Sequence, residues 1–162
     1  MTHERSADSF PARPRRLDLL FSAIQPFYFV TFNTYKRVPF LARAEIHDAL
    51  RAFCARAHEQ FGISTGRYVL MPDHIHLFVA FPQQGTTLRR WIQMLKTVLG
   101  KELLRVGVQK PHWQEGFFDH VLRSGESYSM KWDYVRMNPV RAGLCTHADG
   151  WPYEGEIVSL RY

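Results

Sequence analysis

The chain is poor in cysteine and has no long apolar run. Its 162 residues include only Cys54 and Cys145, which stand far apart and outside any CxxC spacing. This usage excludes a disulfide framework and a cysteine-rich zinc site. No apolar stretch approaches the ~20 residues that a membrane span requires, and the first residues lack the apolar core of a signal peptide. We therefore expect a cytoplasmic protein without a membrane partner.

Acidic residues are also scarce relative to basic ones. The chain has 21 Lys and Arg against 15 Asp and Glu, a net charge of +6 and an isoelectric point near 9.6. Such a balance favours an anionic partner such as nucleic acid. Residues 1–20, with four arginines and two prolines, are expected to be a flexible basic arm that either follows phosphates or is simply solvated. Residues 21–162 have enough apolar side chains to form a single domain.

The spacing of apolar residues divides this domain into alternating strands and helices. Gly62 supplies a stop for the first helix, Thr86 or Thr87 an N-cap for the second, and Ser124 a start for the third. The order β-α-β-β-α-β predicts an α+β fold: a ferredoxin-like antiparallel sheet with two helices on one face and an added C-terminal helix. The expected strands lie near residues 26–34, 67–71, 74–80 and 117–123, and the expected helices near residues 42–61, 88–105 and 126–137.

The segment MPDHIHLFVA, residues 71–80, contains two histidines separated by one apolar residue. In a strand, residues i and i+2 point to the same face, so His74 and His76 would present two imidazoles side by side to one metal ion. They could equally mark a solvated or hydrogen-bonded face of the strand. Asp73 is more suited to fixing the turn or orienting an imidazole than to binding the metal. The apolar residues on the opposite face should meet the two helices; these are Ile75, Leu77 and Val79.

Tyr134 and Asn138 are four residues apart in the expected third helix. Residues at this spacing share a helix face, so a nucleophile and a carboxamide ligand could both reach the imidazoles. Two alternatives remain open. Asn138 before Pro139 is also typical of an N-cap followed by proline at the first helical position. Tyr134 could be an ordinary packed tyrosine.

The second expected helix has a basic polar side. Its cationic side chains either contact phosphates or form a solvated surface. Trp113 is a candidate for stacking on unpaired bases, with core packing as the alternative. We expect His112 and His120 to be structural or DNA-facing rather than metal ligands. The candidate DNA-contacting cations are Arg89, Arg90, Lys96 and Lys101.

Three segments, MPDHIHLFVA, WQEGFFDHVLR and YVRMNPVRAGL, follow one another in this chain. Together they resemble the REP-associated tyrosine transposases of the single-tyrosine, His-hydrophobic-His (HUH) transposase superfamily, over roughly residues 26–145. The resemblance implies that His74 and His76 hold a divalent metal, Mg²⁺ or Mn²⁺, and that Tyr134 is the nucleophile. Asn138 matches the polar residue one helical turn beyond it. Tyr68 and Tyr128 do not stand in a matching motif.

The resemblance further implies a metal-dependent single-stranded DNA endonuclease and strand transferase. Such an enzyme acts on hairpin-forming repeats through a 5′-phosphotyrosine intermediate, so the expected partner is single-stranded or hairpin DNA, bound by a monomer or homodimer. Two other functions are compatible with the residues: a non-catalytic DNA-binding regulator on the same scaffold, and a metal-dependent phosphohydrolase that uses water instead of Tyr134. Replacement of this tyrosine by phenylalanine separates the three.

Overall fold

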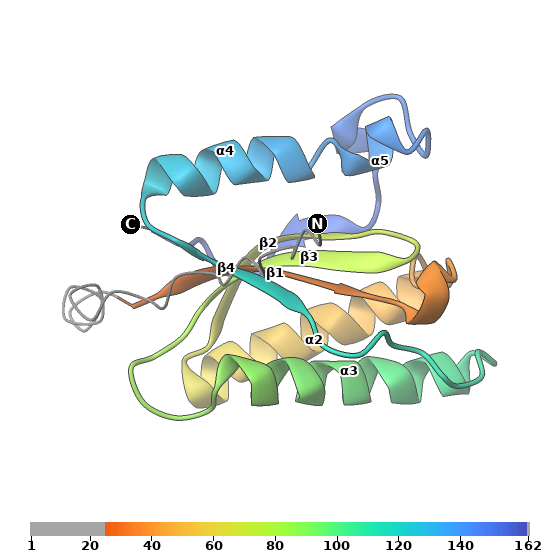
Figure 1. The fold of residues 1–162 in the computed structure, drawn as a ribbon, viewed down its shortest axis with the longest axis horizontal. Helices are drawn as coiled ribbons and strands as arrows, with labels where there is room; N and C mark the ends of the chain where they lie inside the picture. Colours follow the sequence, from red (N-terminus) through yellow and green to blue (C-terminus); the bar gives the residue numbers. More distant parts are fainter. Residues whose placement is uncertain (1–24, 162) are drawn as a thin grey trace, which may run out of the picture.

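A computed structural model describes residues 25–161, so the expected basic arm lies outside the described residues. An antiparallel sheet forms the middle layer, with strand order β4-β1-β3-β2-β5 (Figure 1). The strands are β1 (Phe27–Asn33), β2 (Ser64–Leu70), β3 (His74–Ala80), β4 (Phe118–Leu122) and β5 (Glu154–Glu156).

Helices cover both faces of the sheet. The long helices α2 and α3 lie together under one face, while α4 crosses the other face and continues into the short α5 (Figure 1). This arrangement confirms the predicted α+β class, with two helices on one face and an added helix opposite. The helical elements are α2 (Ala44–Phe61), α3 (Leu88–Arg105), α4 (Gly125–Val135), α5 (Asn138–Arg141) and the 3₁₀ turns η1 (Tyr35–Arg37) and η2 (Ala148–Gly150).

Local sequence signals account for most helix ends. Gly62 follows α2 with a φ of 66°, a conformation in which a side chain is strained. Thr87 caps α3 by accepting a hydrogen bond from the Arg90 amide, and Ser124 caps α4 by accepting one from the Ser127 amide. Of the two threonines expected to cap α3, Thr87 is therefore the one that does so.

Two boundaries and one strand differ from the expectation. Strand β2 begins at Ser64 rather than near residue 67, because Gly66 and its polar neighbours hide the apolar pattern of a strand that has a register shift between Thr65 and Tyr68. Helix α4 ends at Val135, two residues before the expected end. Strand β5 was not expected, since its three residues carry no apolar alternation and pair with β2 only in the tertiary fold.

Strand alternation places two apolar clusters on the two faces of the sheet. On the side of α2 and α3, Val30, Ile75 and Leu77 are fully buried. On the side of α4, Phe29 and Phe78 pack with the helix, joined by Tyr128 and Trp132. Because His74 and His76 alternate with Ile75 and Leu77 along β3, both histidines face the α4 side, as predicted.

Neither cysteine is paired within the described part: Cys54 is buried in α2 and Cys145 is partly exposed. Across residues 25–161, no helix combines the length and apolar character that crossing a membrane requires.

Candidate active site

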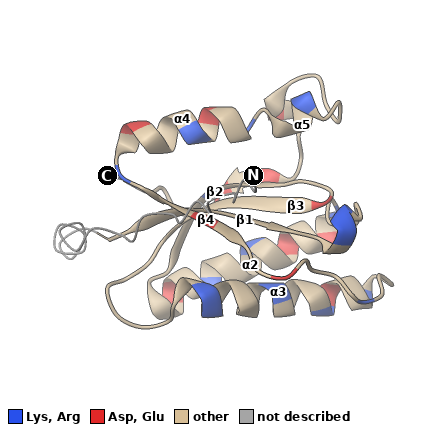
Figure 2. Cartoon of the chain, in the orientation of Figure 1, with Lys and Arg blue, Asp and Glu red and all other residues tan. Residues whose placement is uncertain are grey.

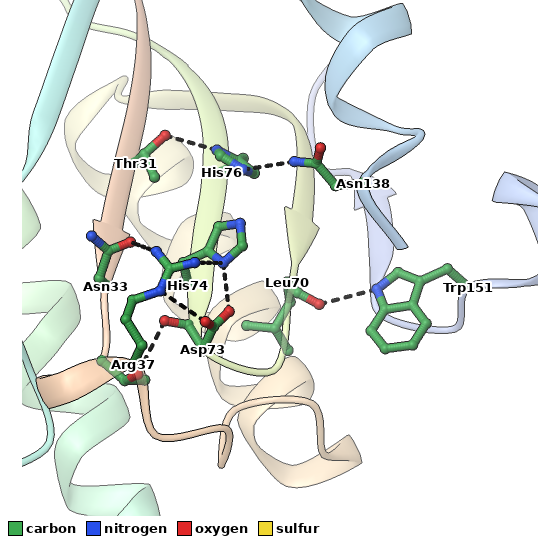
Figure 3. Close-up of polar contacts among 10 residues, drawn as sticks. Thr31, Asn33, Arg37, Leu70, Asp73, His74, His76, Asn138 and Trp151 are labelled. Carbon is green, nitrogen blue, oxygen red and sulfur yellow. Dashed lines mark hydrogen bonds and ion pairs between the residues drawn. The ribbon is translucent and has the colours of Figure 1, made fainter. Parts of the chain in front are cut away.

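The two histidines of β3 lie next to each other on the sheet face that α4 and α5 approach (Figure 3). Their ring centroids are 4.6 Å apart and the ring planes are nearly perpendicular, at 84°. The spacing in sequence therefore becomes a pair of neighbouring imidazoles, as expected for residues i and i+2 of a strand.

Both ring nitrogens of His76 have a partner. Its Nδ1 is 2.7 Å from the Thr31 hydroxyl on β1, and its Nε2 is 2.9 Å from Nδ2 of Asn138 on α5 (Figure 3). Since the Asn138 amide donates, Nε2 must accept, and the proton of a neutral ring sits on Nδ1, where the Thr31 oxygen accepts it. The ring also stacks on Phe29, with centroids 5.4 Å apart. His76 therefore directs an Nε2 lone pair toward Asn138.

His74 is oriented by the turn that precedes β3. Its Nδ1 donates to Oδ1 of Asp73 at 2.6 Å, and Oδ2 of Asp73 accepts from Nε of Arg37 at 2.8 Å. The same guanidinium donates to Oδ1 of Asn33 at 2.7 Å. Asp73 thus orients an imidazole, one of the two roles expected for it, and leaves Nε2 of His74 unprotonated.

Burial keeps both imidazoles neutral. It lowers the pKa of His76 to about 3, and the charges of His74 and Arg37 act in the same direction. Burial also lowers the pKa of His74, although the hydrogen bond to Asp73 opposes this effect. Burial alone would raise the pKa of Asp73, but its bonds with His74 and Arg37 outweigh burial and hold that pKa below its usual value. The result is a carboxylate beside two uncharged rings with available lone pairs.

Arg37 reaches this position from a strained turn. Lys36 and Arg37 in η1 have φ values of 51° and 59°, in the left-handed region that non-glycine residues rarely occupy. Such strain costs of order 1–3 kcal/mol and persists where the surroundings hold the backbone in place. Here the Thr34 amide and hydroxyl bond the Asp73 carbonyl at 2.9 and 3.0 Å, which ties the turn to the start of β3.

Tyr134 and Asn138 lie on two consecutive helices rather than on one. Helix α4 ends at Val135 and α5 begins at Asn138, because Pro139 has no amide proton with which to continue the helix. Arg141 joins the two segments: its Nη2 donates to the Tyr134 carbonyl at 2.7 Å and to Oδ1 of Asn138. Its guanidinium carbon is 4.2 Å from the centre of the Tyr134 ring. A chain of direct contacts therefore runs from His76 through Asn138 and Arg141 to Tyr134.

The alternative interpretations of these two residues do not hold. Met137, not Asn138, is the N-cap residue of α5, and the Asn138 side chain contacts His76. Tyr134 is 64% exposed, whereas Tyr68 and Tyr128 are 1% and 7% exposed. Burial also raises the pKa of Tyr68 to about 12. Among these three tyrosines, only Tyr134 is exposed to solvent.

Two imidazoles and an amide are a donor set that a divalent metal ion can use. Among residues 25–161, no three His, Cys, Asp or Glu side chains form a group that could hold a metal ion. The uncharged side chain in contact with Nε2 of His76 is the amide of Asn138, whose Nδ2 donates to His76 and whose Oδ1 accepts from Arg141. In both histidines Nδ1 bonds an oxygen, which leaves the lone pair on Nε2; in His76 this lone pair accepts from Asn138. Protonation at Nδ1 with an oxygen partner is typical of metal-ligating imidazoles. An uncharged, incomplete set leaves positions for phosphate oxygens and water, unlike a closed structural zinc site.

The structure does not bring the expected DNA-contacting cations to this site. Arg89, Arg90 and Lys101 are exposed on α3, in the layer on the opposite side of the sheet from α4 (Figures 1 and 2). Lys96 is only partly exposed, and its ammonium donates to the carbonyls of Gln114 and Gly116 at 3.0 and 2.6 Å. Lys96 thus holds the connection between α3 and β4.

Trp113 and His112 also belong to this connection. The Trp113 indole donates to the Lys96 carbonyl at 2.9 Å and its ring meets Phe32 edge-on at 5.4 Å, so it takes the packing role rather than that of an exposed stacking platform. His112 is buried and its Nε2 donates to the Val108 carbonyl at 2.9 Å, which makes it structural. His120 is exposed on β4.

The sequence did not predict a role in the site for three residues: Thr31, Arg37 and Arg141. Thr31 had a usable signal, because it is a polar residue on the same face as Phe27 and Phe29 in an aromatic strand. Arg37 had none, since its position depends on an unusual backbone turn. Arg141 lies seven residues after Tyr134, a spacing that becomes meaningful only once both helices are placed.

The chain is similar to one protein family and to several known proteins. The family model described as "Transposase IS200 like" matches residues 25–137. A protein of Haemophilus influenzae named putative REP-associated tyrosine transposase is 28% identical in an alignment of 119 residues that covers 67% of this chain and 65% of that protein. A REP-associated tyrosine transposase of Escherichia coli is 24% identical over 127 residues, 78% of this chain and 73% of the relative. The chain thus spans somewhat less than two thirds of the Haemophilus protein.

Two solved structures share the fold. A REP-associated tyrosine transposase bound to a REP hairpin superposes with a TM-score of 0.63 at 22% identity, covering 81% of this chain and 77% of that one. A putative transposase from Deinococcus radiodurans gives a TM-score of 0.51 at 15% identity, covering 82% and 95%. Since the family model spans more than half of the sequence, the chain belongs to the IS200-like transposase family.

Proposed function

We propose that this protein is a metal-dependent single-stranded DNA endonuclease and strand transferase with Tyr134 as its nucleophile. The observation that carries the proposal is the chain of contacts in which Asn138 touches His76 and Arg141 links Asn138 to the exposed Tyr134. The names of the two bacterial relatives, both REP-associated tyrosine transposases, support the same reaction class.

His74 and His76 would hold the cation through Nε2, with the amide of Asn138 as third ligand. Mg²⁺ or Mn²⁺ bound there would withdraw charge from the non-bridging oxygens of the scissile phosphate. Thr31 and Asp73 would fix the tautomers of the two rings, which keeps both Nε2 lone pairs available.

Tyr134 would attack the phosphorus through its phenolic oxygen. A bond forms between this oxygen and phosphorus, and the bond from phosphorus to the 3′ oxygen breaks; the phenolic proton passes to solvent and the leaving oxygen takes up a proton to become a 3′-hydroxyl. Arg141, whose guanidinium lies against the Tyr134 ring, would stabilise negative charge on the phenolate and phosphate. In reverse, a 3′-hydroxyl attacks the phosphotyrosine and the phenol leaves, which joins strands without nucleotide hydrolysis.

Hairpin-forming repeats are the proposed substrate. The net charge of +6 favours a nucleic acid, and the structurally similar REP-associated transposase is bound to a REP hairpin. The contacts from His76 through Asn138 and Arg141 to Tyr134 lie within one chain, which supports a site that needs no helix from a second copy. We propose that a monomer or a homodimer carries the reaction.

The test is covalent capture of DNA. A single-stranded oligonucleotide with a hairpin and unpaired flanks, labelled at its 3′ end, is incubated with the protein and Mn²⁺ and separated under denaturing conditions. The wild type should give a labelled protein band that is absent with EDTA and absent for Tyr134→Phe. Tyr35→Phe is the matched control, because Tyr35 is also exposed, at 37%, but lies in η1.

Each alternative function predicts a different result. Hairpin binding by the wild type without any adduct would identify a non-catalytic regulator. Cutting that persists in Tyr134→Phe without an adduct would identify a hydrolase that uses water. Either result contradicts the proposal.

A further inference from the structure

Strand β4 extends the sheet face that carries the site. It pairs with β1, and its residues Phe118 and Leu122 stand opposite Thr31 and Phe27. Leu122 is 2% exposed within the cluster that α4 covers. Because alternate residues of a strand share a face, Phe118 and His120 point to the same side as Leu122 and therefore to the side of the site.

Phe118 belongs to one cross-strand row with His76. It stands opposite Thr31, and Thr31 stands opposite His76 on the other side of β1. Neighbouring strands are about 4.8 Å apart, so Phe118 lies roughly 10 Å from His76 across the sheet. His120 occupies the next row, opposite Phe29, on which the His76 ring stacks.

Helix α4 leaves this end of β4 uncovered. Exposure along the face rises from 2% at Leu122 to 59% at Phe118, and His120 between them is also exposed. Within residues 25–161, the Phe118 ring makes no aromatic or cation contact. An aromatic ring exposed in this way offers a face on which an unpaired base can stack.

Cationic groups border the same surface. The Lys131 ammonium on α4 is 5.2 Å from the centre of the Phe29 ring, next to His120. On the other side of Thr31, the Arg37 guanidinium bonds Asn33. Cations that can meet phosphates, together with exposed rings that can meet bases, are the features that bind single-stranded nucleic acid.

We propose that Phe118 and His120 form a stacking platform for the unpaired bases next to the scissile phosphate. The inference rests on the proposed function and adds where the single-stranded flank of the substrate lies: along β4, beside the site, rather than on α3. Stacking needs only the face of a base, so the platform tolerates different flanking sequences.

The test measures DNA binding in a Tyr134→Phe background, which leaves the strand uncut. Oligonucleotides carry 2-aminopurine at successive flanking positions. We expect quenching at one position, and Phe118→Ala should abolish it and weaken binding about 5- to 150-fold, the range for loss of one stacked base. Phe118→Trp should preserve both signals. The salt dependence should not change, because Phe118 meets no phosphate.

Two further variants keep the test decisive. Phe61→Ala is the matched control, since Phe61 is 57% exposed but lies at the end of α2, on the other side of the sheet. Phe118→Leu keeps an apolar side chain in the strand without an aromatic face, and it should weaken binding as alanine does. Affinity and quenching that are unchanged in both Phe118→Ala and Phe118→Leu would contradict the proposed platform. So would a loss that Phe61→Ala reproduces.

The two proposals can fail separately. If wild-type protein forms no covalent adduct with DNA while Phe118→Ala still loses affinity and quenching, the proposed function fails and the platform stands. If the wild type forms the adduct and neither readout depends on Phe118, the platform fails and the proposed function stands.

Discussion

Replacing Thr31 by valine tests how the protein prepares His76 for a metal. The two side chains have nearly the same shape, and valine suits a strand, so the substitution mainly removes one oxygen. That oxygen is 2.7 Å from Nδ1 of His76 and accepts a hydrogen bond from the N–H group there. Without it, the buried N–H has no acceptor, so the tautomer with the proton on Nδ1 becomes less stable relative to the tautomer with the proton on Nε2. A proton on Nε2 would prevent this nitrogen from binding the metal.

The expected loss follows from the hydrogen bond. Leaving a buried donor without a partner costs about 1–3 kcal/mol, and removing a group that orients a metal-ligating histidine lowers metal affinity about 10- to 100-fold. The two ranges overlap, because each 1.4 kcal/mol is a factor of ten in a binding constant. We therefore expect the dissociation constant for Mn²⁺ to rise about 10- to 100-fold in Thr31→Val.

Mn²⁺ binding can be followed by electron paramagnetic resonance of the free ion or by calorimetry. Thr31→Ser should restore most of the affinity, since it returns the hydroxyl. Thr97→Val is the control: it makes the same replacement on α3, where the lost hydroxyl donates to the Gln93 carbonyl. Equal Mn²⁺ affinity of the wild type and a folded Thr31→Val would refute the reasoning that Thr31 sets the tautomer of His76.

Three further predictions concern the fold. Leu77→Ala should lower the free energy of unfolding by about 2–5 kcal/mol, because Leu77 is fully buried under α2 and α3; urea denaturation followed by circular dichroism measures it, and a loss below 1 kcal/mol would be inconsistent with that packing. Gly62→Ala should cost about 1–2 kcal/mol in the same assay, since its φ is 66°; an unchanged midpoint would contradict this. Burial raises the pKa of Cys54 to about 12, so iodoacetamide at pH 8 should label Cys145 in the native protein and spare Cys54. Since an unfolded thiol ionises near pH 8.5, this group should also lower the free energy of unfolding as pH rises from about 8.5 toward 12.

The order of the main elements could be predicted from the sequence because it depends on local signals. Apolar alternation in β1 and β3, helical spacing in α2 and α3, and the stop at Gly62 are properties of neighbouring residues. Strand β5 could not be predicted in the same way. Its residues lack a pattern of their own and become a strand only by pairing with β2.

The same distinction between local signals and tertiary contacts applies to the residues of the site. His74 and His76 were predictable because one strand places both on one face, and the contact of Asn138 with His76 agrees with the predicted convergence. Arg37 and Arg141 were not, since each acts through a contact between segments whose relative position depends on tertiary structure. The expected single helix from Ser124 onward is two helices, because Pro139 interrupts the hydrogen bonding that a continuous helix requires.

The basic side of α3 shows why charge alone did not locate the DNA. Its cations follow from helical spacing, but the spacing says nothing about which layer of the fold carries the reactive residues. The helix packs on the face of the sheet opposite to the histidines (Figures 1 and 2). Contacts of Arg89, Arg90 and Lys101 with DNA stay a prediction, and they would involve parts of the substrate away from the scissile phosphate.

The central claim is that two neighbouring imidazoles and one amide form a metal site within reach of Tyr134. Anomalous scattering from crystals grown with Mn²⁺ tests it most directly. The account predicts a single strong peak that lies within coordination distance of Nε2 of His74, Nε2 of His76 and the side chain of Asn138. A strong peak elsewhere in the molecule, with none between the two imidazoles at saturating Mn²⁺, would contradict it.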